Sequence, residues 1–173
     1  GSFASVARHE MDTFDVVIRD GTLVTAAGTL RADLGIAQGA IAALGHGLGG
    51  RQVIDATGKL VLPGAVDPHV HLEMSTGATT SSDDWQTGTV AAACGGTTTV
   101  IDFAEAAPGE TLISAFEARR AAAEGRAAID FGLHMTLGRA DEATLRQVPE
   151  LASAGLTSFK TYRTSEGFRL RDE

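Results

Sequence analysis

Short apolar runs separated by turn residues fill the first third of the chain, from residue 14 to residue 62. Runs such as Val16-Val17-Ile18 and Leu34-Gly35-Ile36 are each followed by a turn pair, Asp20-Gly21 or Gln38-Gly39. Because glycine readily adopts the positive φ that tight hairpins need, this pattern predicts short strands joined by hairpin turns. We expect a small antiparallel β unit here, with a core too thin to be stable without other contacts.

After residue 62 the pattern changes to apolar strand, loop and helix, repeated. This alternation is typical of βα units that build a parallel sheet. In the third helix we expect Leu145, Val148 and Ala152 to face inward and Pro149 to bend the axis. The expected strands are 65–70, 97–103, 128–135 and 156–162, and the expected helices are 84–94, one that stops at Gly125 and buries Leu112, Ala115, Phe116 and Ala123, and 141–154.

Four βα units in a row either continue as an open doubly wound sheet or close into an eight-stranded barrel, and we expect neither to be complete within this sequence. A half-barrel exposes two strand edges and an apolar interior, so we expect a second polypeptide or a missing carboxy-terminal half to complete it. The predicted fold class is α/β. The predicted organisation is a tag remnant or flexible start at 1–13, a β portion at 14–62, and the first four βα units of an incomplete (β/α)8 barrel at 63–173.

Composition and charge exclude several kinds of partner. The chain has 14 Lys and Arg against 22 Asp and Glu, a net charge of −8, so we expect neither nucleic acid nor an anionic membrane as a partner. No apolar stretch approaches the roughly 18 residues of a membrane span, and the start lacks the apolar segment of a signal peptide. Cys94, the one cysteine, cannot form an internal disulfide, which favours a cytoplasmic protein in which Cys94 is a small buried residue.

The sharpest chemical motif is Pro63-Gly64-Ala65-Val66-Asp67-Pro68-His69-Val70-His71-Leu72, at the carboxyl end of the first parallel strand. Strand alternation places Asp67, His69 and His71 on one face, where two imidazoles can bind one metal ion with the carboxylate behind them. In a barrel this end is the active-site mouth. The alternative is a set of polar residues at a strand end that face solvent; the strand context favours the metal site.

Lys160 is the second candidate, at the end of the fourth strand. Alternation puts Ser158, Lys160 and Tyr162 on one face, and if that face lines a barrel, partial desolvation favours the neutral amine. A neutral amine can add carbon dioxide, and the resulting carbamate is an anionic ligand that can bridge two metal ions. The alternative is a surface lysine whose stem packs along the sheet. Its pairing with the two histidines favours the metal-bridging role.

Two further polar residues follow predicted strands. His134 could reach the metal site, but we expect it to be a hydrogen-bonded structural histidine. We expect Asp102 to have either a supporting role behind the ligands or a role in fixing a loop.

Taken together, these residues resemble the amino-terminal part of the hydantoinase and dihydropyrimidinase group of cyclic amidases, in the amidohydrolase superfamily. The resemblance runs from about Phe14 to the end of the chain, and its motifs keep a specific order and spacing. Four stretches carry it: 63–72, 83–89 with 91–98, 101–103 and 157–160.

The resemblance implies a small β-sandwich over 14–62 beside a metal-dependent (β/α)8 barrel of the TIM type. It also implies two Zn²⁺ or other divalent ions, with His69 and His71 as ligands of one ion and Lys160, carboxylated by carbon dioxide, bridging both. Asp67 would support these ligands from behind. The remaining ligands and the general-base aspartate would lie in the second half of the barrel, so activity requires that half.

The implied reaction is hydrolysis of a cyclic amide or imide, such as a hydantoin or dihydropyrimidine, to an N-carbamoyl product. The intact relatives are commonly homo-oligomers. The loops that carry Met74, Tyr162 and Ser165 border the substrate in such enzymes, and Ser165 stands where the relatives usually have tyrosine, so an allantoinase-like substrate stays open. A non-catalytic dihydropyrimidinase-related assembly protein is the alternative. The three candidate ligands favour the enzyme.

Overall fold

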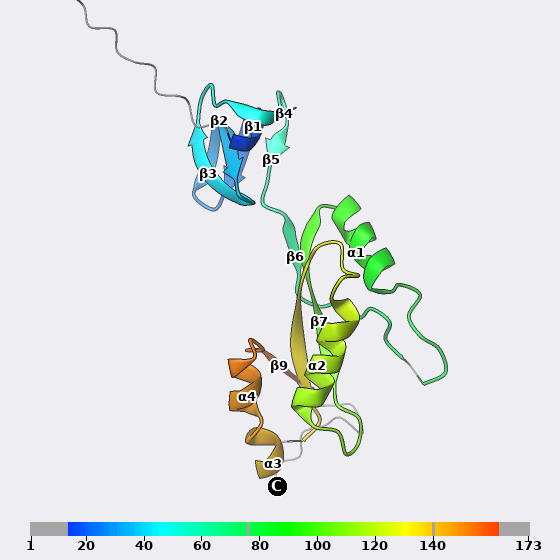
Figure 1. Cartoon of the computed structure of the whole chain (residues 1–173). Coiled ribbons are helices and arrows are strands. Elements are labelled where there is room, and N and C mark those ends of the chain that lie inside the picture. Colours follow the sequence, from blue (N-terminus) through cyan, green and yellow to red (C-terminus); the bar gives the residue numbers. More distant parts are fainter. Residues whose placement is uncertain (1–13, 76, 140, 163–173) are drawn as a thin grey trace, which may run out of the picture. The chain divides into compact units, whose positions relative to one another are not determined.

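The computed structural model describes residues 14–75, 77–139 and 141–162 (Figure 1). The chain divides into two compact units, Gly1–Pro63 and Gly64–Glu173. Each unit has its own hydrophobic core. Leu23, Ala32 and Leu34 form the small core of the first unit, and the larger core of the second is centred on buried side chains such as Trp85 and Met135.

The first unit holds one five-stranded sheet. Its strand order is β3-β2-β1-β4, and β5 also pairs with β1. The predicted hairpins are confirmed, because β1 pairs with β2 and β2 with β3 in antiparallel fashion. The strands are β1 (Phe14–Thr25), β2 (Gly28–Ala37), β3 (Ala40–Gly45), β4 (Gly50–Asp55) and β5 (Leu60–Val61).

The prediction of a purely antiparallel unit is wrong, because β4 and β5 both pair with β1 in parallel. After β3, the chain crosses to the free edge of β1, where β4 runs in the same direction as β1. Alternating apolar residues specify that a segment is a strand and which face is buried, but they do not specify which edge it joins.

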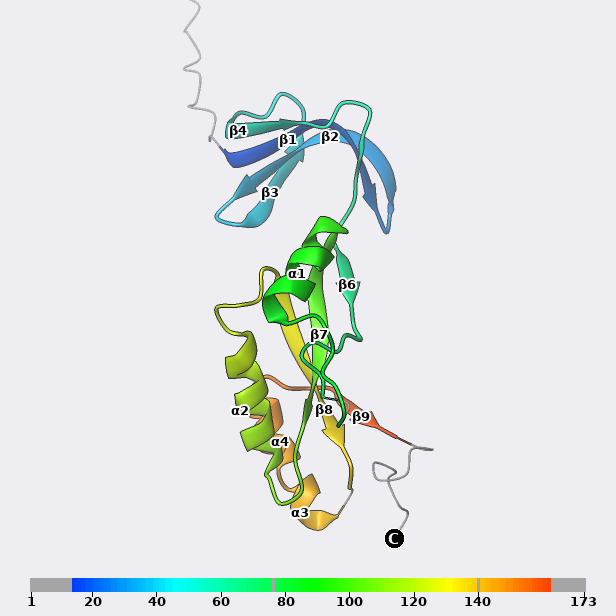
Figure 2. The same ribbon diagram turned by 90° about the vertical axis from the view of Figure 1, so that its right-hand side faces the viewer.

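The second unit is built on a four-stranded sheet in the order β6-β7-β8-β9, with every pair parallel. Strand neighbours in space are also neighbours in sequence, as in the first half of a (β/α)8 barrel, and the predicted fold class is confirmed. Helix α1 lies against β7, and α2 lies against β7 and β8 (Figure 2). The strands are β6 (Ala65–Asp67), β7 (Thr97–Glu105), β8 (Asp130–Leu137) and β9 (Phe159–Thr161), and the helices are α1 (Trp85–Cys94), α2 (Leu112–Ala123), α3 (Glu142–Leu145) and α4 (Val148–Ser153).

Strand alternation separates two faces of this sheet. Alternate residues such as Val100, Ala104 and Met135 are buried and pack with the helices, and the predicted inward face of α2 is confirmed because Leu112, Ala115, Phe116 and Ala123 are all buried. Neighbouring strand residues therefore face the opposite side. That side receives Phe103, His134 and Lys160.

The third predicted helix, 141–154, is two short helices. Gln147 precedes α4, and Pro149 lies in its first turn, where its missing N–H breaks no helical hydrogen bond. In an uninterrupted helix the same proline would clash with the preceding turn. The break changes the phase of the apolar face, so Leu145 and Ala152 are exposed and Leu151 is the buried residue, contrary to the prediction.

Cys94 is exposed, which corrects the prediction that it is buried. The buried residues of α1 are Trp85 and Thr89, four positions apart on one side of the helix. Cys94 is five residues beyond Thr89, and this spacing places it off that line at the last position of the helix. The sequence around Cys94 is rich in alanine, so large apolar and polar residues do not alternate there in a way that shows which side of the helix is buried.

Candidate metal centre

The two histidines of the motif follow β6 instead of lying within it. β6 ends at Asp67, three residues earlier than predicted, and the next residue, Pro68, has no N–H to donate to β7. The chain nevertheless stays beside β7, because the Val70 N–H donates to the Ile101 carbonyl at 3.1 Å. His69 and His71 flank Val70 and therefore project from a segment that is fixed to the sheet.

The imidazoles of His69 and His71 lie against each other. Their Nε2 atoms are 3.3 Å apart and their ring centroids 5.2 Å apart. Two nitrogens that each lie about 2.0–2.1 Å from one tetrahedral Zn²⁺ are separated by roughly 3.3–3.4 Å. The arrangement of the two rings therefore fits a shared zinc ion.

Lys160, from β9, reaches the same place. Its Nζ lies 3.4 Å from His69 Nε2 and 4.0 Å from the centroid of the Phe103 ring. β6 and β9 are the two edges of the four-stranded sheet. Edge strands of a flat four-stranded sheet lie about 14 Å apart, so the sheet must curl toward this face to bring the two side chains together.

Phe103 lies at the centre of the cluster, and the sequence reasoning did not identify it. Its ring centroid is 4.7 Å from that of His69, 4.8 Å from that of His71 and 5.1 Å from that of His134. The side chain is 7% exposed. Its position on β7, facing away from the helices, was the available signal, but an apolar residue there is also what a barrel interior requires.

His134 holds neighbouring segments together. Its Nε2 donates to the Pro68 carbonyl at 3.0 Å, and its Nδ1 lies 2.5 Å from Ser158 Oγ. Donation from Nε2 to a carbonyl leaves Nδ1 of the neutral ring to accept the hydroxyl hydrogen of Ser158. The predicted hydrogen bonding of His134 is confirmed.

Asp67 and Asp102 contact backbone groups near the histidines. Asp67 Oδ1 accepts a hydrogen bond from the backbone N–H of His69 at 3.1 Å. Asp102 is buried, and its Oδ2 accepts one from the N–H of Leu72 at 3.1 Å. Both carboxylates therefore act on the chain that carries the two imidazoles.

The surroundings of His71 favour its neutral form. Burial lowers the pKa of His71 most, and the positive charge of Lys160 lowers it further; Asp102 raises it, the His69 ring lowers it less, and Glu105 has the smallest, raising effect. A neutral imidazole has a lone pair free for a metal ion.

The donor set in this part of the chain is incomplete for a metal ion. Within residues 14–75, 77–139 and 141–162, no three His, Cys, Asp or Glu side chains come together as a metal site. His69 and His71 fit as neutral nitrogen donors. A bare Lys160 ammonium would repel a cation, whereas a carbamate on the same nitrogen would be an anionic oxygen donor.

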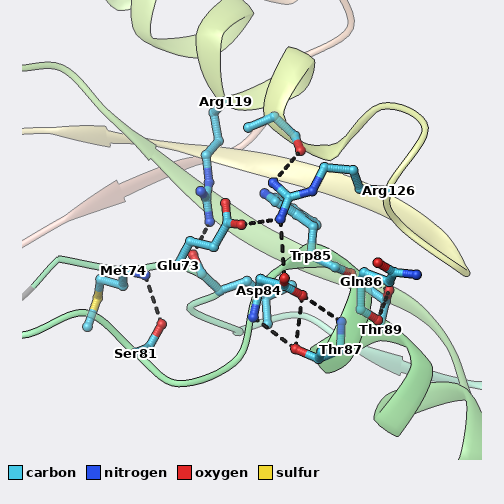
Figure 3. Close-up of polar contacts among 12 residues, drawn as sticks. Glu73, Met74, Ser81, Asp84, Trp85, Gln86, Thr87, Thr89, Arg119 and Arg126 are labelled. Carbon is cyan, nitrogen blue, oxygen red and sulfur yellow. Dashed lines mark hydrogen bonds and ion pairs between the residues drawn. The ribbon is translucent and has the colours of Figure 1, made fainter.

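The loop after the histidines is tied back to the helices. Arg126 pairs with Glu73 and with Asp84, and the Asp84 carboxylate caps α1 by accepting from the Thr87 N–H at 2.7 Å (Figure 3). The Met74 N–H donates to Ser81 Oγ at 2.8 Å. These contacts hold the predicted substrate loop in place.

The other two predicted substrate-loop residues lie after β9. The Tyr162 ring centroid is 4.8 Å from Lys160 Nζ. Ser165 lies outside the described residues.

The chain is similar to known proteins over most of its length. The sequence model of the amidohydrolase family matches residues 60–167. The chain is 45% identical over 149 residues to the D-hydantoinase of Geobacillus stearothermophilus, covering 84% of this chain and 32% of that protein. It is 41% identical over 162 residues to a D-phenylhydantoinase of Escherichia coli, covering 91% of this chain and 35% of that protein.

Solved structures show the same fold. A D-hydantoinase from Bacillus sp. AR9 superposes with a TM-score of 0.86 at 42% identity, over 91% of this chain and 35% of that one. An L-hydantoinase (dihydropyrimidinase) from Arthrobacter aurescens superposes with a TM-score of 0.73 at 27% identity, over 91% of this chain and 35% of that one. The chain thus spans about a third of the length of the relatives that it matches.

Proposed function

We propose, because this chain belongs to the amidohydrolase family, that it forms the first part of a metal-dependent cyclic amidase that opens hydantoin-like rings. The observation that carries the proposal is the meeting of three nitrogens: His69 Nε2 lies 3.3 Å from His71 Nε2 and 3.4 Å from the Nζ of Lys160, which is 91 residues away in the sequence. Chance rarely brings two imidazoles and an amine from opposite edges of a sheet to one point. The D-hydantoinases among its relatives suggest the substrate class.

The residues of this chain would hold two divalent ions, which we take to be zinc. His69 and His71 would bind one ion through Nε2, and Lys160, as a carbamate formed with carbon dioxide, would bridge both. Bound ions of this kind supply Lewis acidity, which acidifies water near neutral pH and polarises a scissile carbonyl. Asp67 holds the backbone of His69, and the Phe103 ring stacks on the His71 ring and contacts the His69 ring at a tilt.

The remaining machinery belongs to the part of a barrel beyond this chain's four strands. A general base that takes a proton from water and returns it to the leaving ring nitrogen is required for ring opening. The product would be an N-carbamoyl amino acid. We therefore propose that a carboxy-terminal half, or a second polypeptide, completes the site, and that the complete enzyme is a homo-oligomer in the cytoplasm.

The substrate ring is the most specific part of the proposal. A substrate in this site would lie beside the loop that carries Met74 and the end of β9 that carries Tyr162. Hydrolysis of hydantoin, 5-phenylhydantoin, dihydrouracil and allantoin by the complete protein should be compared. We expect the hydantoins to have the highest kcat/KM, and a preference for allantoin would instead support the allantoinase-like alternative.

Metal analysis of the complete protein tests the centre directly. We expect two zinc equivalents, and native mass spectrometry of the intact protein should show a mass increase of one carbon dioxide that is absent from the Lys160→Ala variant. Metal-free protein with an unmodified lysine would contradict the proposal and support the non-catalytic assembly protein.

Substitution of the ligands makes the same test by residue. His71→Ala and Lys160→Ala should each reduce zinc content and abolish hydrolysis, because each removes a donor. His46→Ala, at an exposed histidine of the first unit, is the matched control and should retain both zinc and activity.

A further inference from the structure

A buried ion pair lies next to the candidate metal centre and takes no part in the proposed chemistry. Asp102 of β7 and Arg119 of α2 are joined by a 2.5 Å contact, and their side chains are only 2% and 18% exposed. Burying two charges costs desolvation energy, and an apolar pair of similar volume often stabilises a fold at least as well. The pair therefore calls for an explanation beyond stability.

Both members of the pair bind the residue that directly follows His71. The Leu72 N–H donates to Asp102 Oδ2 at 3.1 Å, and the Arg119 guanidinium donates to the Leu72 carbonyl. Figure 3 shows Arg119 directed from its helix toward the start of the loop at Glu73. The two peptide groups flanking the α-carbon of Leu72 are thus fixed, one by each charge of the pair.

The same carboxylate reaches the centre by a second route. Asp102 Oδ1 accepts from the Phe103 N–H at 2.5 Å, and the Phe103 ring contacts both imidazoles. Asp102 faces the helices while Phe103 faces the metal side, because neighbouring strand residues alternate. One buried carboxylate is therefore bonded both to the backbone after His71 and to the backbone of the aromatic residue beneath the rings.

We propose that the Asp102–Arg119 pair is a positioning clamp: it fixes the backbone of Leu72 and so directs the His71 imidazole toward the metal ion. The inference rests on the proposed function for the identity of the ion, but the hold on Leu72 stands on the contacts alone. In a purely structural role, the pair could be replaced by apolar side chains with no effect on the metal.

Three variants of the complete protein separate the two roles. Arg119→Met leaves an unpaired buried carboxylate and should destabilise the fold. The double variant Asp102→Leu/Arg119→Met removes both charges and should recover much of that stability, but it cannot rebuild the clamp. Arg120→Met is the matched control, since Arg120 is the next residue of the same helix, is 43% exposed and forms ion pairs with Glu117 and Glu124.

Two measurements report on the clamp. Hydrogen exchange of the peptide spanning 69–75 reports on the Leu72 N–H without any metal. Titration with Co²⁺, followed by its visible absorption spectrum, reports on the geometry at the imidazoles. In the double variant we expect faster exchange, an altered cobalt spectrum and an affinity about 10–100-fold lower, as is typical when partners that orient metal ligands are lost.

Arg120→Met should match the wild type in both measurements. A double variant that recovers stability and keeps wild-type exchange and cobalt spectrum would overturn the clamp. If the wild type binds no cobalt, the proposed function fails, and exchange alone decides: faster exchange in the double variant supports the hold on Leu72, and unchanged exchange refutes it.

Discussion

One aromatic side chain, Phe103, contacts both candidate histidine ligands and the candidate bridging lysine. A rigid ring in such a place restricts the rotamers of the side chains that pack on it. The Nζ of Lys160 also lies over the face of this ring, 4.0 Å from its centroid. Phe103 therefore influences the site by packing, with no donor atom of its own.

We predict that Phe103→Leu weakens zinc binding by the complete protein and also lowers the free energy of unfolding by about 1–2 kcal/mol, within the range for shortened core side chains. The matched control is Phe116→Leu, since Phe116 is similarly buried, at 5% exposed, but faces the helix side of the sheet. Phe116→Leu should lower the free energy of unfolding by a similar amount and leave the zinc affinity unchanged. Chemical denaturation and zinc titration measure the two effects, and equal zinc affinities in both variants would contradict the prediction.

The candidate ligands and the supporting Asp67 could be chosen from the sequence, whereas Phe103 and Arg119 could not. His69, His71 and Lys160 are residue types with distinctive chemistry at the ends of recognisable strands. Phe103 and Arg119 have no such mark, because a phenylalanine in a strand and an arginine in a helix are ordinary. Their importance follows from register and helix rotation, which depend on tertiary packing.

Among the elements, the hairpin between β2 and β3 shows most directly how local sequence sets geometry. Ala37 pairs with Ala40, and the two residues between them, Gln38 and Gly39, have φ values of 52° and 75°. Two positive φ values in a two-residue loop are typical of a type I′ turn, in which Asn-Gly is the preferred pair. Glycine fits this geometry without strain, whereas glutamine does not.

We predict that Gln38→Asn stabilises the first unit by about 0.5–1 kcal/mol, part of the roughly 1–2 kcal/mol penalty of a left-handed residue. The backbone N–H of residue 38 keeps its bond to Asp15 in either case. Gln38→Val should have the opposite effect, because a branched Cβ is most strained at positive φ. Urea denaturation followed by circular dichroism gives both values, and a destabilised asparagine variant would refute the turn assignment.

Element types were well predicted, and element edges and partners less so. The hairpin glycines and the βα spacing identified the strands of both sheets. β6 ends just before Pro68, and the third predicted helix is interrupted just before α4, whose first turn contains Pro149. Both boundaries depend on how a single proline fits against a neighbouring strand or helical turn. The parallel entry of β4 beside β1 depends on pairing between distant segments, which the local pattern does not encode.

At the scale of the whole molecule, the two units differ in what stabilises them. The first unit has a small core and a buried carboxylate, Asp33, 2% exposed, which accepts hydrogen bonds from the N–H groups of Asp20 at 2.9 Å and Leu48 at 3.1 Å. The Asp20 N–H lowers the pKa of Asp33 most, burial opposes this, and the Leu48 N–H lowers it again, leaving the pKa below 3.8.

The sign of the pH effect follows from that lowered pKa. A carboxyl group whose pKa is lower in the folded state than in the unfolded state stabilises the fold above its unfolded pKa, and this contribution is lost as pH falls through the folded value. We predict that Asp33→Asn makes the first unit less stable at pH 7 and flattens the pH dependence of its stability below pH about 4.

The two units can be followed separately in this experiment, because the one tryptophan, Trp85, is fully buried in the second unit. Acid titration by circular dichroism should change in Asp33→Asn, while the transition in Trp85 fluorescence should not. Asp130→Asn, at an exposed aspartate of β8, is the control and should leave the first unit unchanged. An unaltered acid transition in Asp33→Asn would show that this carboxylate contributes nothing to the pH dependence.

Because the second sheet is curled, the distance from His69 to Lys160 depends on the curvature of all four strands. A substitution that flattens β7 or β8 would therefore change the distance between His69 and Lys160 without contacting either residue. Bulky replacements deep between the sheet and its helices are therefore expected to act at a distance on the histidine–lysine contact, and its 3.4 Å length is a sensitive gauge of the sheet's curvature.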